Sequence, residues 1–285
     1  MATLLKISNL GITVRTDASS RTLLKNIHLD VTPEEIVALV GASGGGKTSL
    51  GLSILRLLPL AMEIDEGSIV FKEENILAMP LSGMRQIRGK KIGMVFQESL
   101  SAFNPVFRIG DQIAEVTQTH LGLSRAKAMN RVDELLDLVE VGDPRKVARS
   151  YPHELSGGLR QRAMIAQAMA ASPDLVIADE PTSNLDVTIQ AKILELFKKL
   201  RKEMHLSILL ITHDLGLVRF IADRIFVLYD GRIVESGEAK AVLDAPVHDF
   251  TKKLLMATKI CNCLKSIMSE NISLRHVIFW EKLTT

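Results

Sequence analysis

The sequence predicts an α/β fold built around a mostly parallel sheet that is covered on both faces. Short apolar runs alternate with longer stretches of helical spacing, which is typical of strand–helix–strand units. The runs are continuous and rich in β-branched residues, so both faces of each strand are expected to be buried. With 285 residues and 47% hydrophobic content, the chain can bury one large core, or a core with a smaller subdomain attached. The buried strands are expected at residues 36–40, 92–96, 175–178 and 206–212.

The first predicted strand leads into a predicted helix. Leu50, Ile54, Leu57 and Leu58 recur at helical spacing, so they are expected to share one buried face. Pro59 cannot continue a helix, so the helix is expected to stop there. This gives a strand, a loop and a helix in direct succession.

A hairpin and a helical insertion complete the expected elements. Asp230-Gly231 lies between two apolar runs, which favours a two-residue hairpin turn. From about residue 98 to 171 the pattern is helical without convincing strands, as residues 125–139 illustrate. We therefore expect a helical segment inserted into the sheet domain.

Composition and charge argue against several classes of protein. Lys and Arg number 35 against 33 Asp and Glu, and no long run has one sign, so a nucleic-acid partner is not expected. The only cysteines, Cys261 and Cys263, are too few for a disulfide framework and suit a reducing compartment. Cys-x-Cys alone is a weak metal motif, and we assign it no site.

The sequence also predicts no targeting or membrane-spanning segment. The first ten residues lack a charged stretch followed by an apolar one. No apolar run approaches the ~18 to 20 residues that cross a bilayer. A cytoplasmic location is therefore expected, with any membrane role played as a peripheral partner.

A glycine-rich segment between the first strand and its helix fits the phosphate-binding pattern G-x-x-x-x-G-K-[ST]. Its glycines allow backbone N–H groups to surround a phosphate, and the helix start adds a favourable dipole. Lys47 is expected to reach the β- and γ-phosphates, and Thr48 to offer its hydroxyl to Mg²⁺. A chance Gly-rich loop would rarely have this strand–helix context, so we favour a nucleotide site. Its predicted residues are Gly41, Ala42, Ser43, Gly44, Gly45, Gly46, Lys47 and Thr48.

The strand predicted at residues 175–178 is followed by two carboxylates, Asp179 and Glu180. Ligands of open α/β sheets gather at the carboxyl ends of strands. Alone, the pair could equally be solvated charges at a strand terminus. Combined with the phosphate loop, it predicts that Asp179 is a direct or water-mediated Mg²⁺ ligand and that Glu180 polarises the attacking water.

A second helix start has the features of an anion site. Ser156 is placed as the N-cap of a helix that runs to about residue 171, and Gly157 and Gly158 expose backbone N–H groups. On capping statistics alone, an ordinary capped helix is the simpler interpretation.

These motifs together resemble the nucleotide-binding subunits of ABC transporters, whose signature is similar to Leu155-Ser-Gly-Gly158 upstream of Asp179-Glu180. The resemblance covers about residues 4–257. It implies a P-loop NTPase (RecA-like) core with an ABC-type β subdomain and an inserted α-helical signature subdomain. The implied parts are a core at about 1–97 and 172–235, a helical subdomain at 98–171, a cassette extension at 236–257 and a divergent tail at 258–285.

The resemblance also implies roles for residues that the pattern alone does not explain. Gln97 is similar to the Q-loop residue that senses Mg²⁺ and the membrane subunit, so it is a catalytic and metal-binding candidate. Residues 183–186 resemble the D-loop, which makes Asp186 a nucleotide-binding candidate. His213 resembles the switch histidine that contacts the γ-phosphate; a lone histidine is otherwise more often structural or exposed.

By the same resemblance, two chains share each nucleotide. ATP and Mg²⁺ would be held between Lys47 and Thr48 of one chain and Ser156, Gly157 and Gly158 of the other. Glu180 and His213 would assist hydrolysis, which reopens the pair.

Three segments narrow the resemblance to importers of dipeptides, oligopeptides and nickel: residues 96–114, 151–158 and 185–190. This subgroup implies a second, different ABC ATPase subunit, two transmembrane permease subunits and an extracytoplasmic substrate-binding protein. The chain would lie at the cytoplasmic face of the inner membrane. Residues 103–107 would help to transmit closure to the permeases.

Several positions depart from the family pattern, including Ala42 and Gly45 in the phosphate loop, where Glu and Ser are more usual. Val14 stands where relatives usually carry an aromatic residue that stacks on adenine. Glu34 stands where relatives favour Gly, in a turn that would be strained if it needs a positive φ.

Two alternative functions fit the sequence less well. A soluble ABC ATPase outside transport would typically bring tandem cassettes, zinc-binding cysteine pairs or a long coiled coil, and the sequence contains none of these. A degenerate regulatory subunit would be expected to lack Lys47, Glu180 or His213, and all three are present.

Overall fold

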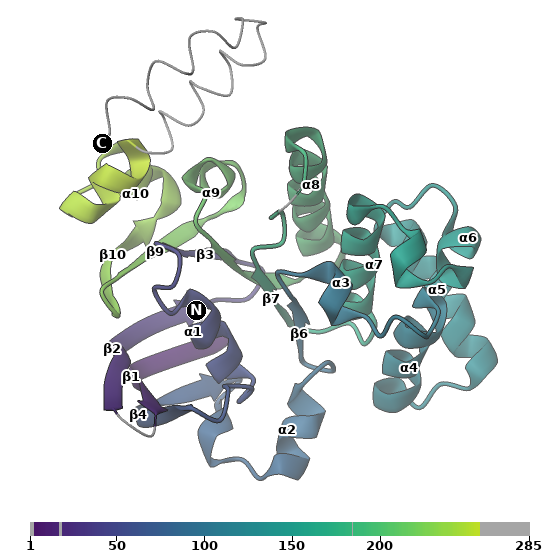
Figure 1. Ribbon diagram of the computed structural model, residues 1–285, viewed down its shortest axis with the longest axis horizontal. Helices are drawn as coiled ribbons and strands as arrows, with labels where there is room; N and C mark the ends of the chain where they lie inside the picture. The colour runs from purple at the N-terminus through teal and green to yellow at the C-terminus, as the bar shows by residue number, and fades with distance from the viewer. Residues whose placement is uncertain (1–2, 17–18, 184, 257–285) are drawn as a thin grey trace, which may run out of the picture.

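The computed structural model describes residues 3–16, 19–183 and 185–256, which form two sheets with flanking helices (Figure 1). The predicted tail at 258–285, with Cys261 and Cys263, lies outside the described residues, as does position 184 of the predicted D-loop. The α/β fold expected from the sequence is confirmed.

The larger sheet has six strands in the order β10-β9-β3-β8-β7-β6. All pair in parallel except β10, which returns antiparallel to β9 through a turn at Asp230 and Gly231. Both turn residues have positive φ, as a type I′ hairpin requires. The predicted buried strands are confirmed to within one residue at each end. The strands are β3 (Ile36–Gly41), β6 (Ile92–Val95), β7 (Leu175–Asp179), β8 (Ser207–Thr212), β9 (Arg224–Tyr229) and β10 (Arg232–Glu238).

Both faces of this sheet are covered, which explains the continuous apolar runs. Val37 and Leu39 of β3 belong to the core shared with α1 (Lys47–Ile54) and the smaller sheet. Ile36, Ala38 and Val40 point to the other face. That face is covered by α8 (Val187–Met204), α9 (Leu215–Ile221) and α10 (Ala239–Asp244).

The smaller sheet is antiparallel, in the order β2-β1-β4-β5, and sequence analysis did not identify its strands individually. In β1 the buried side chains shift phase, from Leu5 and Ile7 to Leu10 and Ile12. The pairing register shifts between Ile7 and Leu10, where Asn9 has a φ of +50°. Because this irregularity breaks the two-residue alternation, the strand pattern is hidden. The strands are β1 (Leu5–Thr16), β2 (Ser19–Val31), β4 (Met62–Phe71) and β5 (Glu74–Asn75).

Helix α1 ends at Ile54, so the prediction that it continues to Pro59 was wrong. Arg56 adopts a left-handed φ of +51°, and its N–H donates to the Ser53 carbonyl at 3.0 Å. The N–H of Leu57 donates back to Leu52 at 2.9 Å. This pair of bonds closes the helix in a Schellman arrangement, which usually uses glycine. Leu57 is consequently 41% exposed instead of lying on the buried face.

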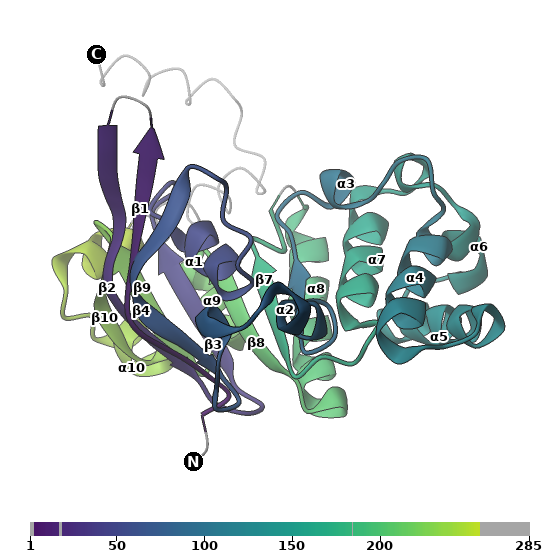
Figure 2. The same ribbon diagram turned by 90° about the horizontal axis from the view of Figure 1, so that it is seen from below.

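Helices without intervening strands fill the chain between β6 and β7, and they lie beyond the β6 edge of the larger sheet (Figure 2). They are α3 (Ser99–Ala102), α4 (Ile109–Leu121), α5 (Arg125–Leu138), α6 (Pro144–Arg149) and α7 (Gly157–Met169); α2 (Leu81–Ile87) precedes β6. Helix α7 packs against β6 and against α3, α4 and α5. No helix of the described segments is long and apolar enough to span a bilayer.

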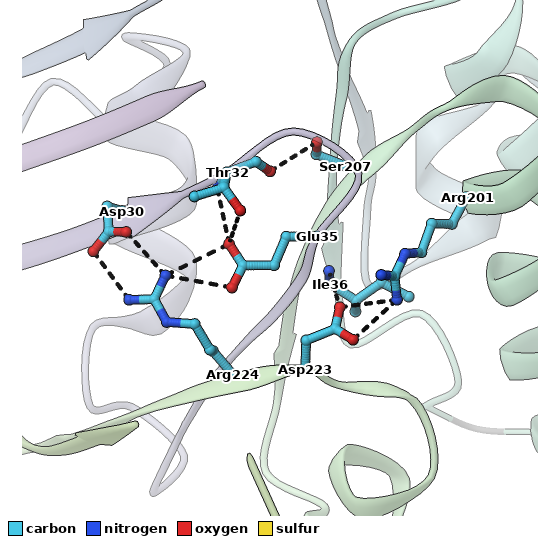
Figure 3. Close-up of polar contacts among 8 residues, drawn as sticks. All are labelled: Asp30, Thr32, Glu35, Ile36, Arg201, Ser207, Asp223 and Arg224. Atoms are coloured by element: carbon cyan, nitrogen blue, oxygen red, sulfur yellow. Dashed lines mark hydrogen bonds and ion pairs between the residues drawn. The ribbon is translucent and has the colours of Figure 1, made fainter. Parts of the chain in front are cut away.

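A polar network joins the two sheets at the end where β3 and β9 begin, opposite their carboxyl ends (Figure 3). Arg224 forms two hydrogen bonds to Asp30 of β2, at 2.9 and 3.1 Å, and a third to Glu35 at 3.3 Å. The bond to Asp30 is the main reason that the pKa of Arg224 is raised. Glu35 also accepts from the N–H and hydroxyl of Thr32, both at 2.8 Å. The turn between β2 and β3 is thereby fixed, and Glu34 within it has a φ of +59°.

Candidate nucleotide-binding site

The glycine-rich loop spans the short gap between β3 and α1. Gly46 caps the helix in a left-handed conformation with a φ of +94°, and a Cβ there would lie 2.7 Å from Leu24 of β2. Gly44 also has a positive φ, of +74°, and faces open space. The N–H of Gly45 donates to Ala42 at 3.2 Å, which closes the turn. The loop therefore leaves a concave backbone surface at a helix start, which suits a phosphate. The predicted residues Gly41, Ala42, Ser43, Gly44, Gly45, Gly46, Lys47 and Thr48 are all on this strand–loop–helix segment.

Lys47 is the first residue of α1 and is only 6% exposed. Its Nζ donates to the carbonyl oxygens of Gly41 and Ala42, both at 3.0 Å, so the ammonium group is held against the loop. Burial lowers the pKa of Lys47, and the negative charges of Glu180 and Asp179 partly oppose that effect. The ion pairs within the described segments do not include Lys47, so its charge is available to an anion.

Asp179 ends β7 and is 2% exposed. The pKa of its carboxyl group is raised, mainly because the group is buried, and the charge of Glu180 adds to this effect. A hydrogen bond from Thr48 and the charge of Lys47 oppose it. Its Oδ1 atom has no hydrogen-bond partner among the described residues. A buried carboxylate oxygen without a partner, beside a hydroxyl, has the donor chemistry that Mg²⁺ prefers.

Glu180 and His213 follow neighbouring parallel strands. The N–H of Glu180 donates to Ile211 of β8 at 2.8 Å, and Glu180 itself has a φ of +46°. His213 Nδ1 lies 2.7 Å from Glu180 Oε1. The Glu180 side chain is 12% exposed and that of His213 is 57% exposed. The carboxylate is therefore largely buried, whereas the imidazole is accessible to solvent. A carboxylate in this position can orient a water molecule, and the imidazole can hold the carboxylate in place.

Gln97 and Asp186 are placed differently from the core of the site. Gln97 is the second residue after the end of β6 and is exposed, and its carbonyl oxygen accepts from the Ser183 hydroxyl at 3.4 Å. No hydrogen bond from its side chain to Thr48 or Asp179 occurs within the described part of the chain. Asp186 is the exposed N-cap of α8, and its backbone oxygen accepts the first hydrogen bonds of that helix.

The second predicted anion site lies at the start of α7. Ser156 is its N-cap and accepts from Leu159 at 3.4 Å, which agrees with the capping pattern. A Cβ on Gly157 would lie 3.6 Å from Leu185, and one on Gly158 would lie 3.2 Å from Ile189. The start of α7 is thus beside the start of α8.

The glycine-rich loop belongs to a different part of the fold. Helix α1 packs on β3, β7 and β8, whereas α7 packs on β6 and its neighbouring helices (Figure 2). The structure therefore brings together Lys47, Thr48, Asp179, Glu180 and His213, and it leaves Ser156, Gly157 and Gly158 in a separate group.

Gln190 is a further residue of this region, for which the sequence predicted no role. Its Nε2 atom donates to the carbonyl oxygens of Thr182 and Leu185, on the loop between β7 and α8. The sequence signal was its place at the end of residues 185–190, one of the three segments that narrow the resemblance. Side-chain contacts to backbone carbonyls have no sequence pattern of their own.

The described segments contain no group of three or more His, Cys, Asp or Glu side chains that could hold a metal by themselves. A cation at Thr48 and Asp179 would therefore need further ligands, such as phosphate oxygens or water.

Comparison with protein families gives a match between residues 24–183 and the family described as ABC transporter. Curated relatives extend the similarity. The chain is 49% identical over 258 residues to a Brucella ovis protein with the provisional name of peptide import ATP-binding protein; 88% of this chain and 76% of the relative are covered. A Brucella abortus protein with the same kind of name is 45% identical over 256 residues, covering 90% and 77%.

Solved structures give the same result. A dimeric structure of a bacterial ABC transporter cassette superposes with a TM-score of 0.74 at 29% identity, covering 82% of this chain and 98% of that one. The cbiO1 protein of Clostridium perfringens, part of the ABC transporter complex cbiONQ, superposes with a TM-score of 0.73 at 25% identity, covering 86% and 92%.

Proposed function

The chain is an ATPase subunit of the ABC transporter family, and from that premise we propose that it powers the import of peptides through partner subunits in a membrane. One observation carries the chemical part of the proposal. Lys47, Thr48, Asp179, Glu180 and His213 come from three separate segments, and their charges and hydrogen bonds meet at the carboxyl edge of one sheet.

Each of these side chains has a distinct role in the proposed reaction. Lys47, held on the loop and without an ion pair among the described residues, neutralises the β- and γ-phosphates of ATP. Glu180 orients the attacking water and accepts its proton, because it lies at the strand end without being the metal ligand. His213 fixes the Glu180 carboxylate and reaches the γ-phosphate from the exposed side of the site.

Thr48 and Asp179 would hold Mg²⁺. The fit rests on the Oδ1 atom of Asp179, which is buried and has no hydrogen-bond partner among the described residues. When bound, the ion would neutralise phosphate charge and help to fix the phosphate oxygens. Gln97 is proposed to reach the same region when the chain is closed on its partner.

The second half of each site would come from another ATPase subunit. The start of α7, with Ser156, Gly157 and Gly158, is exposed enough to meet a phosphate but belongs to a different group of helices from Lys47. The dimeric cassette to which the chain is similar supports a pair of subunits. We propose that the partner is a second, different ABC ATPase and that Asp186 lies close to the shared nucleotides.

The names of the curated relatives support peptides as the transported substrate. In that function the chain acts with two permease subunits and an extracytoplasmic substrate-binding protein, at the cytoplasmic face of the inner membrane. The exposed side chains of Val106 and Phe107, at 70% and 54%, offer an apolar contact for a permease. Nickel, the other cargo suggested by the sequence, is the alternative outcome of the transport test.

The test compares wild type with Lys47→Ala in the complete transporter, reconstituted in vesicles with its binding protein. We expect Lys47→Ala to abolish both ATP hydrolysis and uptake of a labelled dipeptide or oligopeptide, because the phosphates lose their cation. Lys202→Ala, which changes a lysine of α8 that lies outside the site, is the matched control. Near-normal hydrolysis by Lys47→Ala would contradict the assigned site, and uptake of Ni²⁺ without peptide uptake would contradict the substrate.

A further inference from the structure

One side chain of α8 binds two carbonyl groups of the loop between β7 and α8. Gln190 lies in the first turn of α8, and its Nε2 atom donates to Leu185 O at 3.0 Å and to Thr182 O at 3.2 Å. A primary amide has two N–H groups, and here each has its own acceptor. The two carbonyls flank the middle of the loop, so Gln190 fixes both sides of it at once.

This loop contacts the catalytic edge of its own chain. The N–H of Ser183 donates to the carbonyl of Glu180 at 3.1 Å. The hydroxyl of Ser183 donates to the carbonyl of Gln97 at 3.4 Å. A movement of the loop would therefore also displace Glu180 and Gln97.

The same loop also contacts the start of α7. Leu185, whose carbonyl accepts from Gln190, lies against Gly157, and Ile189 in the first turn of α8 lies against Gly158. Because the start of α7 is proposed to bind the nucleotide of the partner subunit, the loop touches parts of both paired sites. Leu185 is only five residues after Glu180 in the chain, so the catalytic carboxylate and that second surface are linked through this short segment.

On the basis of the proposed function, we propose that Gln190 is a positioning residue that couples the two ATP sites. It holds the loop in one shape, so that the position of Glu180 and the position of the α7 start change together. Without it, the loop can shift at one end while the other end stays in place. Each site would still bind ATP, but closure of the dimer at one site would no longer position the catalytic groups of the other site.

The chemistry of the contact predicts which side chains can replace glutamine. Methionine has a similar shape but no donor, so Gln190→Met removes both hydrogen bonds without adding a charge. Lysine has three donors and a comparable reach, so Gln190→Lys is expected to retain part of the function. Asparagine keeps the amide but is shorter, so Gln190→Asn is expected to lose one of the two bonds.

The experiment measures ATP hydrolysis by the complete transporter as a function of ATP concentration. We expect Gln190→Met to lower kcat by about tenfold to a hundredfold, because a small misplacement of catalytic groups has effects of this size. KM for ATP should stay within about twofold of wild type, because the glycine-rich loop is unchanged. The Hill coefficient for ATP should fall toward 1, since it reports coupling between the sites. Lys192→Met, which places the same side chain on the exposed face of α8, is the matched control.

A purely structural role for Gln190 would give a different result. It would lower the midpoint of thermal unfolding and leave the Hill coefficient of the folded protein unchanged, which overturns the proposal. Wild-type kcat and Hill coefficient in Gln190→Met, or equal losses in Lys192→Met, would also overturn it. Should Gln190→Met fail to fold, Gln190→Asn takes its place, and wild-type behaviour of that variant is the contradicting result.

The outcome for Gln190 can be separated from that of the proposed function. If Lys47→Ala abolishes hydrolysis and Gln190→Met does not affect it, only the role of Gln190 fails. If the wild-type transporter hydrolyses no ATP, the proposed function fails first.

Discussion

The Nδ1 atom of His213 lies 2.7 Å from the Oε1 atom of Glu180, and this contact joins the ends of β8 and β7. The two residues are 33 positions apart in the chain, so the sheet order is what brings them together. The carboxylate is thereby held in one orientation beside the glycine-rich loop.

We expect His213→Ala to lower kcat for ATP by about tenfold or more, because the Glu180 carboxylate loses the group that orients it. KM should change less, since Lys47 still holds the phosphates. The control is His205→Ala, which also removes a histidine that contacts a glutamate, Glu34 at 3.0 Å. If both variants behave alike in steady-state kinetics, the His213 contact has no special role.

Asp179→Asn should have opposite effects on stability and on activity. Because burial raises the pKa of Asp179 above its ordinary value of 3.8, the folded protein holds this proton more tightly than the unfolded chain does. The free energy of unfolding therefore falls as pH rises through the window above 3.8, and the ionised carboxylate destabilises the nucleotide-free protein at neutral pH. Because asparagine removes this charge, the midpoint of thermal unfolding should rise at pH 7. The rise should become smaller as the pH is lowered.

The same substitution should impair MgATP hydrolysis, because a neutral amide is a poorer ligand for a hard cation. Asp137→Asn, an exposed change on α5, is the control for both measurements. A lower midpoint at pH 7, or full activity at limiting Mg²⁺, would contradict this interpretation of Asp179.

Val14 is connected to α1 through Met62. It pairs directly with Met62 of β4, so the two side chains share a face of the sheet, and Met62 contacts the hydroxyl of Ser49 at 3.6 Å. Val14→Tyr should tighten ATP binding by about 0.5 to 1.5 kcal/mol if the ring stacks on adenine. Thr13→Tyr, on the opposite face, should leave the Kd unchanged. An unchanged Kd in Val14→Tyr would show that Val14 does not contact the base.

Glu34 adopts a φ of +59°, a conformation that favours glycine. Glu34→Gly should raise the free energy of unfolding by up to about 1 kcal/mol, because a side chain in this region costs about that much or more. The backbone N–H of Glu34 donates to the Ser207 hydroxyl at 2.8 Å, and glycine can keep this bond. Denaturant unfolding of Glu34→Ala is the control, since alanine removes the carboxylate but keeps the strained Cβ. If Glu34→Ala raises the free energy of unfolding by the same amount, the effect comes from loss of the charge and not from relief of backbone strain.

The sequence predicts best the elements whose environment is uniform. Strands β3, β7 and β8 are buried along their whole length, so each appears as an unbroken apolar run. The glycine-rich loop is equally visible, because phosphate binding demands fixed residue types at fixed spacing.

Features that depend on local irregularity or on pairing were not predictable from the residues alone. The irregularity at Asn9 hides the alternation of β1, and the left-handed Arg56 ends α1 five residues before Pro59. The contact between Glu180 and His213 depends on β7 and β8 being neighbours, which no short sequence window specifies. The two hydrogen bonds of Gln190 likewise depend on the path of the loop in front of it.

The most direct test of the account is ATP turnover by Glu180→Gln, because glutamine keeps the size and hydrogen bonding of the side chain but cannot accept the proton. The chain is combined with its partner ATPase, and the assembly state is followed by size-exclusion chromatography in MgATP. Glu195→Gln, an exposed change on α8, is the control. We predict that Glu180→Gln still binds ATP, loses its own turnover by about a hundredfold or more, and accumulates as a nucleotide-loaded dimer. Wild-type turnover without any shift toward the dimer would show that Glu180 is not the catalytic carboxylate.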